Sequence, residues 1–187
     1  MHQFAQSFRP EKAAEPEITE AKALIHKIRA TLGFAIDGGG KIQHQWLNTC
    51  GSRPGTNFYE WFYQALKDGK VRLVAAALAE GEKKRLRIDH GFPDDQFEYT
   101  YIAVANVTKT RYIVSNDMHF YEPACKDAND KAKARARTER KGCACRYLKH
   151  KLRITVGTVQ HAAVELWAEG GPVVALGPET QDQGCVN

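Results

Sequence analysis

Acidic side chains stand where short apolar runs of the sequence give way to polar residues. Asp117 follows the β-branched run 112–115, and Asp37 directly follows the apolar residues 34–36. Asp95 stands at the start of an apolar helical pattern that comes before the run 112–115. Runs of this kind predict buried strands, and open α/β sheets place their chemistry at the carboxyl ends of such strands. The sequence therefore directs attention to a sheet edge that carries carboxylates.

The stretch 94–120 resembles the C-terminal half of PIN-like nuclease domains. Those domains carry an acid at the start of a helix, then an apolar strand, then a segment of the form I-V-[ST]-N-D-x-x-F. The matching residues here are Asp95, Phe97, Ala105, the run 113–117 and Phe120. The resemblance extends over roughly residues 18 to 167. It implies an α/β fold of the PIN-like three-layer type, with a central, mostly parallel sheet flanked by helices.

PIN-like domains are similar to one another in gathering carboxylates at the carboxyl edge of the sheet, where the acids bind one or two Mg²⁺ or Mn²⁺ ions. Such ions prefer oxygen ligands, and a pair about 3.5–4 Å apart activates water for in-line attack on a phosphodiester. The resemblance implies that Asp37, Asp95 and Asp117 are catalytic and bind metal. Asp94 and Glu60 are further candidate metal ligands, because the register at the helix start is uncertain and one family acid is missing.

The chain departs from the PIN-like pattern near its N-terminus. Family members begin with a strand that ends in Asp, and no such strand is predicted before Glu17. The run 34–37 resembles a second strand of one bacterial branch, written l-D-x-x-G-x-I-x-x-E-Y, but Gln45 stands where that branch has an acid. Asp37 or Glu60 could fill the gap.

Two functions therefore stay open for a PIN-like chain of this kind. The first is a metal-dependent endonuclease, acting on RNA in preference to DNA, in the manner of a toxin or a defence effector. The second is a PIN-like module that has lost catalysis and binds nucleic acid or a protein partner such as an antitoxin.

A long basic segment follows the acidic unit and is expected to form an insertion at about 121–151. Its candidate nucleic-acid-binding cations are Lys131, Lys133, Arg135, Arg137, Arg140, Lys141 and Arg146. A concentration of cations next to a nuclease-like segment is typical of phosphate binding, so nucleic acid is the expected partner. The plainer interpretation is a solvated, charge-rich helix or loop.

The same segment carries side chains of the types found in structural zinc sites. They are Cys125, Cys143, Cys145 and His150. The Cys-x-Cys spacing is shorter than is usual for a zinc site, so reduced thiols without a metal are the alternative.

Two other features allow more than one interpretation. The glycines 38–40 precede Lys41, as in a phosphate loop of a nucleotide-binding α/β protein, but the loop's spacing and its Ser or Thr are absent. A turn that needs positive φ is the favoured interpretation. His119 lies where a polar residue often follows the last acid of PIN-like domains, and the simpler expectation is an ordinary surface or core histidine.

Composition sets limits on the class of protein. The chain has 187 residues, of which 43% are hydrophobic and 26% charged, as in an ordinary globular domain, and its formal net charge is +5. No apolar run approaches the ~20 residues of a membrane span, and the first ten residues lack a signal sequence. A cytoplasmic protein without a membrane partner is therefore expected. Five unevenly spaced cysteines argue against a disulfide framework, and homo-oligomerisation stays open.

Alternating helical and strand patterns set the expected domain limits. The expected parts are a tail at 1–16, an α/β domain at 17–167 and a second tail at 168–187. Strands are expected at 34–36, 112–115 and 154–156. We expect these strands to share one parallel sheet, because each is short, apolar and set between helical patterns. Residues 41–46 are expected to continue the chain from the first strand after the glycine turn.

Overall fold

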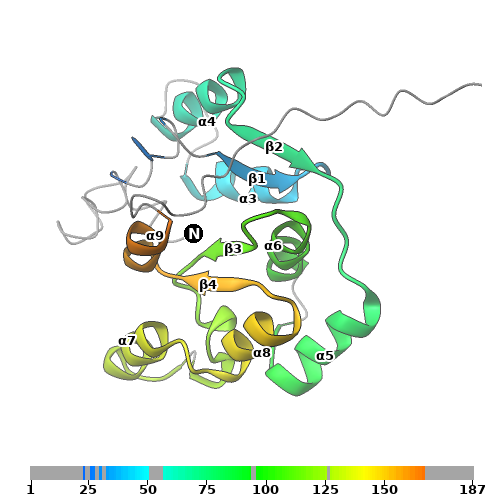
Figure 1. The fold of residues 1–187 in the computed structure, drawn as a ribbon, viewed down its shortest axis with the longest axis vertical. Coiled ribbons are helices and arrows are strands. Elements are labelled where there is room, and N and C mark those ends of the chain that lie inside the picture. Colours follow the sequence, from blue (N-terminus) through cyan, green and yellow to red (C-terminus); the bar gives the residue numbers. More distant parts are fainter. Residues whose placement is uncertain are drawn as a thin grey trace, which may run out of the picture.

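The protein has a mixed α/β fold that is mostly helical and contains two small parallel sheets. The computed structural model describes residues 33–50, 57–93, 96–125 and 127–166, with the single positions 23, 26, 27 and 30. Figure 1 shows the sheets in the middle of the molecule, with α4 towards one end and α7 and α8 towards the other. The expected tails at 1–16 and 168–187 lie outside the described residues.

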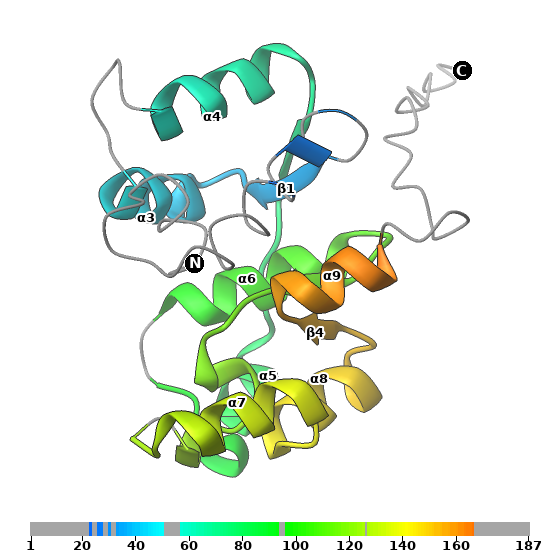
Figure 2. The same ribbon diagram turned by 90° about the vertical axis from the view of Figure 1, so that its left-hand side faces the viewer.

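The first sheet is built by β1 (Phe34–Asp37) and β2 (Val71–Val74), which run parallel with Phe34 opposite Val71. Between them along the chain come α3 (Lys41–Cys50) and α4 (Asn57–Lys67). These elements occupy the upper half of Figure 2. Among the aromatic side chains of α4, Phe58 and Phe62 are fully buried and Trp61 is 7% exposed, whereas Tyr63 is 36% exposed.

The second sheet is built by β3 (Tyr112–Val114) and β4 (Thr155–Gly157), again parallel, with Tyr112 opposite Thr155. The helices that precede β3 are α5 (Glu80–His90) and α6 (Gln96–Val107). Between β3 and β4 come the 3-10 turns η2 (Met118–Phe120) and η3 (Pro123–Cys125), then α7 (Asp130–Glu139) and α8 (Cys143–Lys151). The last element is α9 (Val159–Glu165). Its N-cap is Thr158, whose hydroxyl accepts a hydrogen bond from His161 N.

Two hydrophobic clusters surround the two sheets, and α6 contributes to both. The cluster around the first sheet includes Ile36, Phe58 and Val104 of α6. The cluster around the second sheet includes Ile102 of α6 and Leu148, both fully buried. Burying an aliphatic or aromatic side chain of this size stabilises a fold by about 1.5–3 kcal/mol. Helix α6 also contacts β1 and β3, so it connects the two sheets.

The prediction of one parallel sheet is wrong for the described strands. β1 pairs with β2 and β3 pairs with β4, and no hydrogen-bond ladder joins the two pairs. Each of these strands is only three or four residues long, and β1 and β3 both pack against α6. Parallelism and strand positions were predictable from the apolar runs, whereas the division into two sheets depends on how α6 packs against them.

The glycine turn leads directly from β1 into helix α3. Gly40 has φ of 76°, which confirms the predicted turn with positive φ. Residues 41–46 then belong to helix α3, so their expected continuation from the strand is wrong. The helix forms because Asp37 accepts hydrogen bonds from the amides of Lys41 (2.9 Å) and Ile42 (2.8 Å), which have no partner within the helix.

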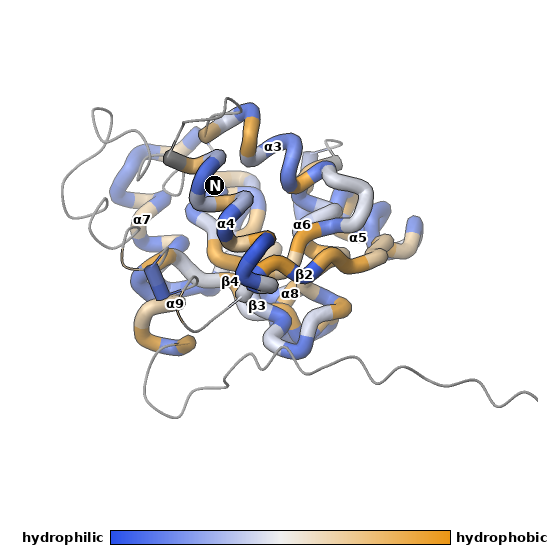
Figure 3. Tube along the Cα trace, turned by 90° about the horizontal axis from the view of Figure 1, so that it is seen from above, coloured by the Kyte–Doolittle hydropathy of each residue, from blue (hydrophilic) through white to orange (hydrophobic). Residues whose placement is uncertain are grey.

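The basic segment is regular structure and not a loop. α7 is charged along its length, and Figure 3 shows hydrophilic residues alternating with hydrophobic ones there. α8 contributes Ala144, Cys145 and Leu148 to the core and contacts β4. The expected insertion is therefore in part a structural layer of the fold. None of the helices in the described ranges is long and apolar enough to cross a membrane.

Candidate metal centre

The structure brings together Glu98, Asp117 and His119, and each offers one ligand atom within 4.8 Å of the others. Glu98 lies in the first turn of α6, while Asp117 and His119 follow the carboxyl end of β3. Contact between α6 and β3 sets these two segments side by side. Among the residues that the structure describes, this is the one group of three or more His, Cys, Asp or Glu side chains with metal-binding geometry.

Hydrogen bonds fix Asp117 and His119 in the turn after β3. The Asp117 amide donates to Ser115 Oγ (3.0 Å), and Asp117 Oδ1 accepts from the His119 amide (3.0 Å). Asp117 therefore caps η2, and the short turn holds its carboxylate next to the imidazole. Nearby, Tyr121 Oη donates to the Ser115 carbonyl (2.7 Å) and Arg137 Nε donates to the Asn116 carbonyl (2.9 Å). The backbone after the strand is thus held at several points.

The imidazole of His119 lies between the two carboxylates. Its Nδ1 is 3.1 Å from Glu98 Oε1 and 3.2 Å from Asp117 Oδ1. A single nitrogen thus faces two acids, as it would on the ligand side of a shared cation. His119 is hydrogen-bonded and 24% exposed, as a satisfied histidine of the fold would be, and its two acidic neighbours also allow a metal.

Glu98 is the unusual member of the group because it is buried and incompletely bonded. It is 9% exposed, and its Oε2 atom has no hydrogen-bond partner. Burial raises the pKa of this carboxyl and the charge of Asp117 raises it further, while a backbone hydrogen bond of Glu98 and the contact with His119 act in the opposite direction. An ionised carboxylate in this place is costly unless a cation compensates it. This is the feature that points to a missing positive ligand.

The sequence-predicted acids are only partly gathered at this centre. Asp117 is a member of the group, but Asp37 is not, because both of its carboxylate oxygens cap α3. Glu60 is exposed on α4 and is not in the group. Asp94 and Asp95 lie outside the described residues, directly before α6. The arrangement of Asp37 also occupies the amides that a phosphate loop would use, which disfavours the nucleotide-loop alternative at Gly38 to Lys41.

Glu98 is the residue that sequence reasoning missed. An acid was expected at the start of this helix, and the choice fell on positions 94 and 95. Residues three positions apart lie on the same face of a helix, so an acid one turn beyond position 95 could serve the same place. The sequence signal for Glu98 is therefore its place one turn beyond position 95.

Several cations of the predicted nucleic-acid-binding set are used within the fold. Arg140 forms a two-pronged ion pair with Glu165, and Glu165 also accepts from Tyr112 Oη at 2.9 Å. Arg135 Nε lies 2.6 Å from Glu139 Oε1, and Lys141 Nζ lies 3.8 Å from Glu139 Oε2. Arg137 binds the Asn116 carbonyl. The pairs of Arg135 and Lys141 with Glu139 are exposed and weak, so phosphate binding by these two cations, as by Lys131, Lys133 and Arg146, stays a prediction.

The four candidate zinc ligands are not brought together in the structure. Cys145 is buried in the core, whereas His150 is exposed. Cys143 and Cys145 are two residues apart on α8 and so point about 200° away from each other around the helix. Cys143 Sγ instead donates to Glu122 Oε1 at 3.2 Å, and burial together with this carboxylate raises the thiol pKa to about 11. A protonated thiol of this kind is a poor zinc ligand.

Comparison of the chain with protein-family models, curated proteins and solved structures finds no significant match. The case for function therefore rests on the geometry of the site itself.

Proposed function

We propose that Glu98, Asp117 and His119 bind a divalent metal ion, and that the protein is a metal-dependent phosphodiester hydrolase acting on nucleic acid. The observation that carries the proposal is the buried Glu98, whose Oε2 has no partner beside a second acid and an imidazole. A divalent cation would relieve the cost of burying this carboxylate and its repulsion from Asp117. The metal would act as a Lewis acid on the phosphoryl group and lower the pKa of a bound water.

The ligand types refine the choice of metal. Carboxylates suit Mg²⁺ and Mn²⁺, whereas imidazole suits transition metals and is a poor partner for Mg²⁺. A site with two carboxylates and one imidazole therefore favours Mn²⁺ over Mg²⁺. Three protein ligands leave positions for water and a phosphate oxygen, as catalysis requires. His119 would bind through Nδ1, the nitrogen that faces both acids.

A PIN-like arrangement is part of this proposal, although the hydrogen-bonded sheets are smaller than that resemblance implies. Two features support it. β1 and β3 each have an Asp at or just after their carboxyl end, and both contact the helix that carries Glu98. In this arrangement Asp37 would be the acid of the first family strand, with a capping role, and Glu98 would take the place of the helix-start acid.

The alternative is a PIN-like module that binds nucleic acid or a protein partner without cleaving. The capping role of Asp37 favours it, since this carboxylate is committed to the amides of α3 and the described centre holds only two carboxylates. Two acids and one imidazole suffice for one metal ion and are too few for a metal pair. The two candidates differ in whether the bound strand is cut.

Cleavage assays with defined metals separate these candidates. Labelled single-stranded RNA and DNA are incubated with the wild type, Asp117→Asn and the control Asp68→Asn, which removes an exposed acid after α4. We expect cleavage with Mn²⁺, weaker cleavage with Mg²⁺, none in EDTA, and loss of about 10²-fold or more in Asp117→Asn alone. Absence of cleavage by the wild type with both metals would favour the non-cleaving module. Cleavage that persists in EDTA and in Asp117→Asn would rule out the metal centre.

A further inference from the structure

Strand β2 forms an open edge of the first sheet. Figure 1 shows β1 between β2 and α6, and β1 contacts both α3 and α6. Leu73 of β2 lies opposite Ile36 of β1, yet Ile36 is fully buried whereas Leu73 is 60% exposed. A strand at the edge of a sheet presents a row of backbone groups with which another chain can pair.

Hydrogen bonding occupies only one side of β2. The ladder with β1 ends at the bond from Gly38 N to the Val74 carbonyl (2.9 Å). Alternate residues of a strand bond the same neighbour, so the amides and carbonyls of Val71 and Leu73 face away from β1. These groups have no hydrogen-bond partner among the residues that the structure describes. The free edge of β2, formed by Val71 and Leu73, therefore offers donors and acceptors to a further strand.

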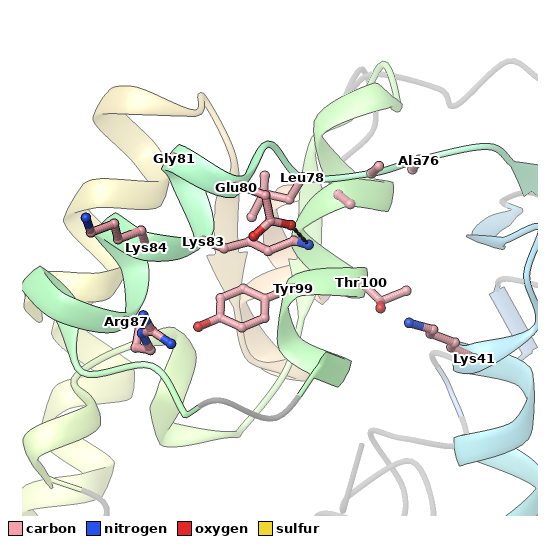
Figure 4. A pocket seen from close by; sticks show the side chains of 12 residues that line it. Lys41, Ala76, Leu78, Glu80, Gly81, Lys83, Lys84, Arg87, Tyr99 and Thr100 are labelled. Atoms are coloured by element: carbon pink, nitrogen blue, oxygen red, sulfur yellow. Dashed lines mark hydrogen bonds and ion pairs between the residues drawn. The ribbon is translucent and has the colours of Figure 1, made fainter.

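Both ends of β2 are held in place by the fold. At the start of the strand, Lys70 N donates to the Ala65 carbonyl of α4 (2.9 Å). After the strand, Ala76 and Leu78 line a cavity of about 700 Å³ together with Tyr99 of α6. Figure 4 shows Ala76 and Leu78 on the connection that leads into α5. An incoming strand would therefore meet an edge that already has its bound conformation, which lowers the entropic cost of binding.

The charge around the free edge indicates which kind of strand fits it. Lys67, Lys70 and Arg72 lie in β2 or just before it, and none forms an ion pair within the described part of the chain. The acid among them, Asp68, accepts a hydrogen bond from Gln64 Nε2 (2.8 Å). Pairing of two copies of this edge would bring like cations together, which destabilises a sheet, whereas an incoming strand with acidic side chains would be attracted.

We propose that the free edge of β2 binds an extended, acidic segment of a partner protein, which adds to the first sheet as a further strand. Successive side chains of a strand point to opposite faces, so Val71 and Leu73 lie on one face and Lys70 and Arg72 on the other. The matching segment alternates apolar and acidic residues. Backbone bonds to the edge supply affinity, and the alternating side chains supply the preference.

This inference goes beyond the proposed hydrolase activity. The free edge belongs to the first sheet, whereas Asp117 and His119 of the metal centre follow β3 of the second sheet. Strand pairing needs no metal, so it is tested in EDTA and its outcome is independent of Mn²⁺-dependent cleavage.

The test is binding of a fluorescein-labelled synthetic peptide of about eight residues in which Glu and Val alternate, followed by anisotropy. The edge variant is Leu73→Pro, which removes an amide donor that faces away from β1. Proline is tolerated in edge strands at such positions. The matched control is Leu73→Thr, which keeps the amide and suits a strand. Thermal melts by circular dichroism verify that all three proteins are folded.

We expect Leu73→Pro to bind the peptide about tenfold or more weakly than the wild type, because it loses a backbone bond and the ring stands on the edge. Leu73→Thr should stay within about threefold of the wild type. A second peptide, in which two central Val are replaced by Pro, should bind the wild type about tenfold or more weakly too, and this comparison does not depend on the folding of a variant. Equal binding of the two peptides by the wild type would overturn the proposal.

A charge test and a mass measurement distinguish the occupants. Lys70→Gln with Arg72→Gln should weaken binding roughly fivefold, whereas Arg146→Gln with Lys149→Gln, two exposed cations of α8, should change it less than about twofold. Equal weakening by the two pairs would overturn the proposal, since the effect would then be one of net charge. Analytical ultracentrifugation should show a monomer. A dimer that Leu73→Pro dissociates would overturn the proposal in favour of a second copy at this edge.

Discussion

The substitution Glu98→Gln should make the protein more stable than the wild type in the absence of metal. When metal is bound, the wild type should be the more stable of the two. In EDTA, the wild type keeps a buried carboxylate whose Oε2 has no partner and which faces Asp117. The neutral amide has the same shape but carries no charge to desolvate or to repel Asp117, so the variant should be more stable than the wild type by about 1 kcal/mol. For a chain of this length that corresponds to a rise in Tm of about 2–4 °C.

Saturating metal should stabilise the wild type much more than the variant. A ligand at about 100 times its Kd stabilises the folded state by about 2.7 kcal/mol, or roughly 5–10 °C in Tm. We expect the wild type to gain this shift with Mn²⁺ and Glu98→Gln to gain little of it, because one of three ligands has lost its charge. The assay is differential scanning fluorimetry with Mn²⁺ or EDTA, with Asp68→Asn as the control. A variant that is less stable than the wild type in EDTA and shows the same Mn²⁺ shift would refute the reasoning.

The geometry supports three further predictions. The folded-state pKa of Glu98 is raised, so its contribution to stability is fully present below the unfolded value of about 4.5 and is lost as pH rises through the folded pKa. In EDTA, urea titrations should therefore show that the wild type loses stability over that pH range. The same titrations of Glu98→Gln should show a flatter profile. Mn²⁺ affinity measured by calorimetry should rise over the same range, as metal displaces the proton, and an affinity independent of pH would contradict this. Gly157→Ala should destabilise the fold by about 1–3 kcal/mol, because a Cβ there would lie 2.0 Å from Tyr112 Oη and 2.9 Å from His161 Cβ. Adding Tyr112→Phe should recover part of that loss in thermal melts, and a Gly157→Ala protein as stable as the wild type would show that the contact relaxes freely.

Strand positions and the acid after β3 were predictable because they depend on local patterns. A β-branched run followed by Ser115, Asn116 and Asp117 indicates a strand that ends in a polar turn, and β3 and η2 have that form. The N-cap at Thr158 was predictable for the same reason. Local hydrogen bonding and side-chain period act within a few residues, so they leave a signal in the sequence.

The role of Asp37 was not predictable from its position after a strand. No helix was predicted at residues 41–46, so this carboxylate was left available for metal. Folding of α3 instead brings two amides onto its oxygens, and that depends on the sharp turn at Gly40. The zinc prediction is not supported by the structure for a related reason. Once α8 is a helix, Cys143 and Cys145 face different surroundings, a carboxylate and the core.

Glu98 required information that no local pattern contains. Its partners lie about twenty residues further along the chain, and the contact exists because α6 packs against β3. The division of the strands into two pairs has the same origin. Both features depend on where α6 lies relative to elements that are distant in sequence.

The position of Tyr101 has a consequence for how the protein unfolds. Its hydroxyl accepts from Trp46 Nε1 (2.7 Å) and donates to Gln45 Oε1 (2.9 Å), and its ring packs against both hydrophobic clusters. Separation of either cluster from α6 would expose this side chain, and separation of α3 would also break that pair of bonds. The two clusters should therefore behave as one cooperative unit, in which amide protons of α3 and α8 become accessible to hydrogen exchange in a single opening event.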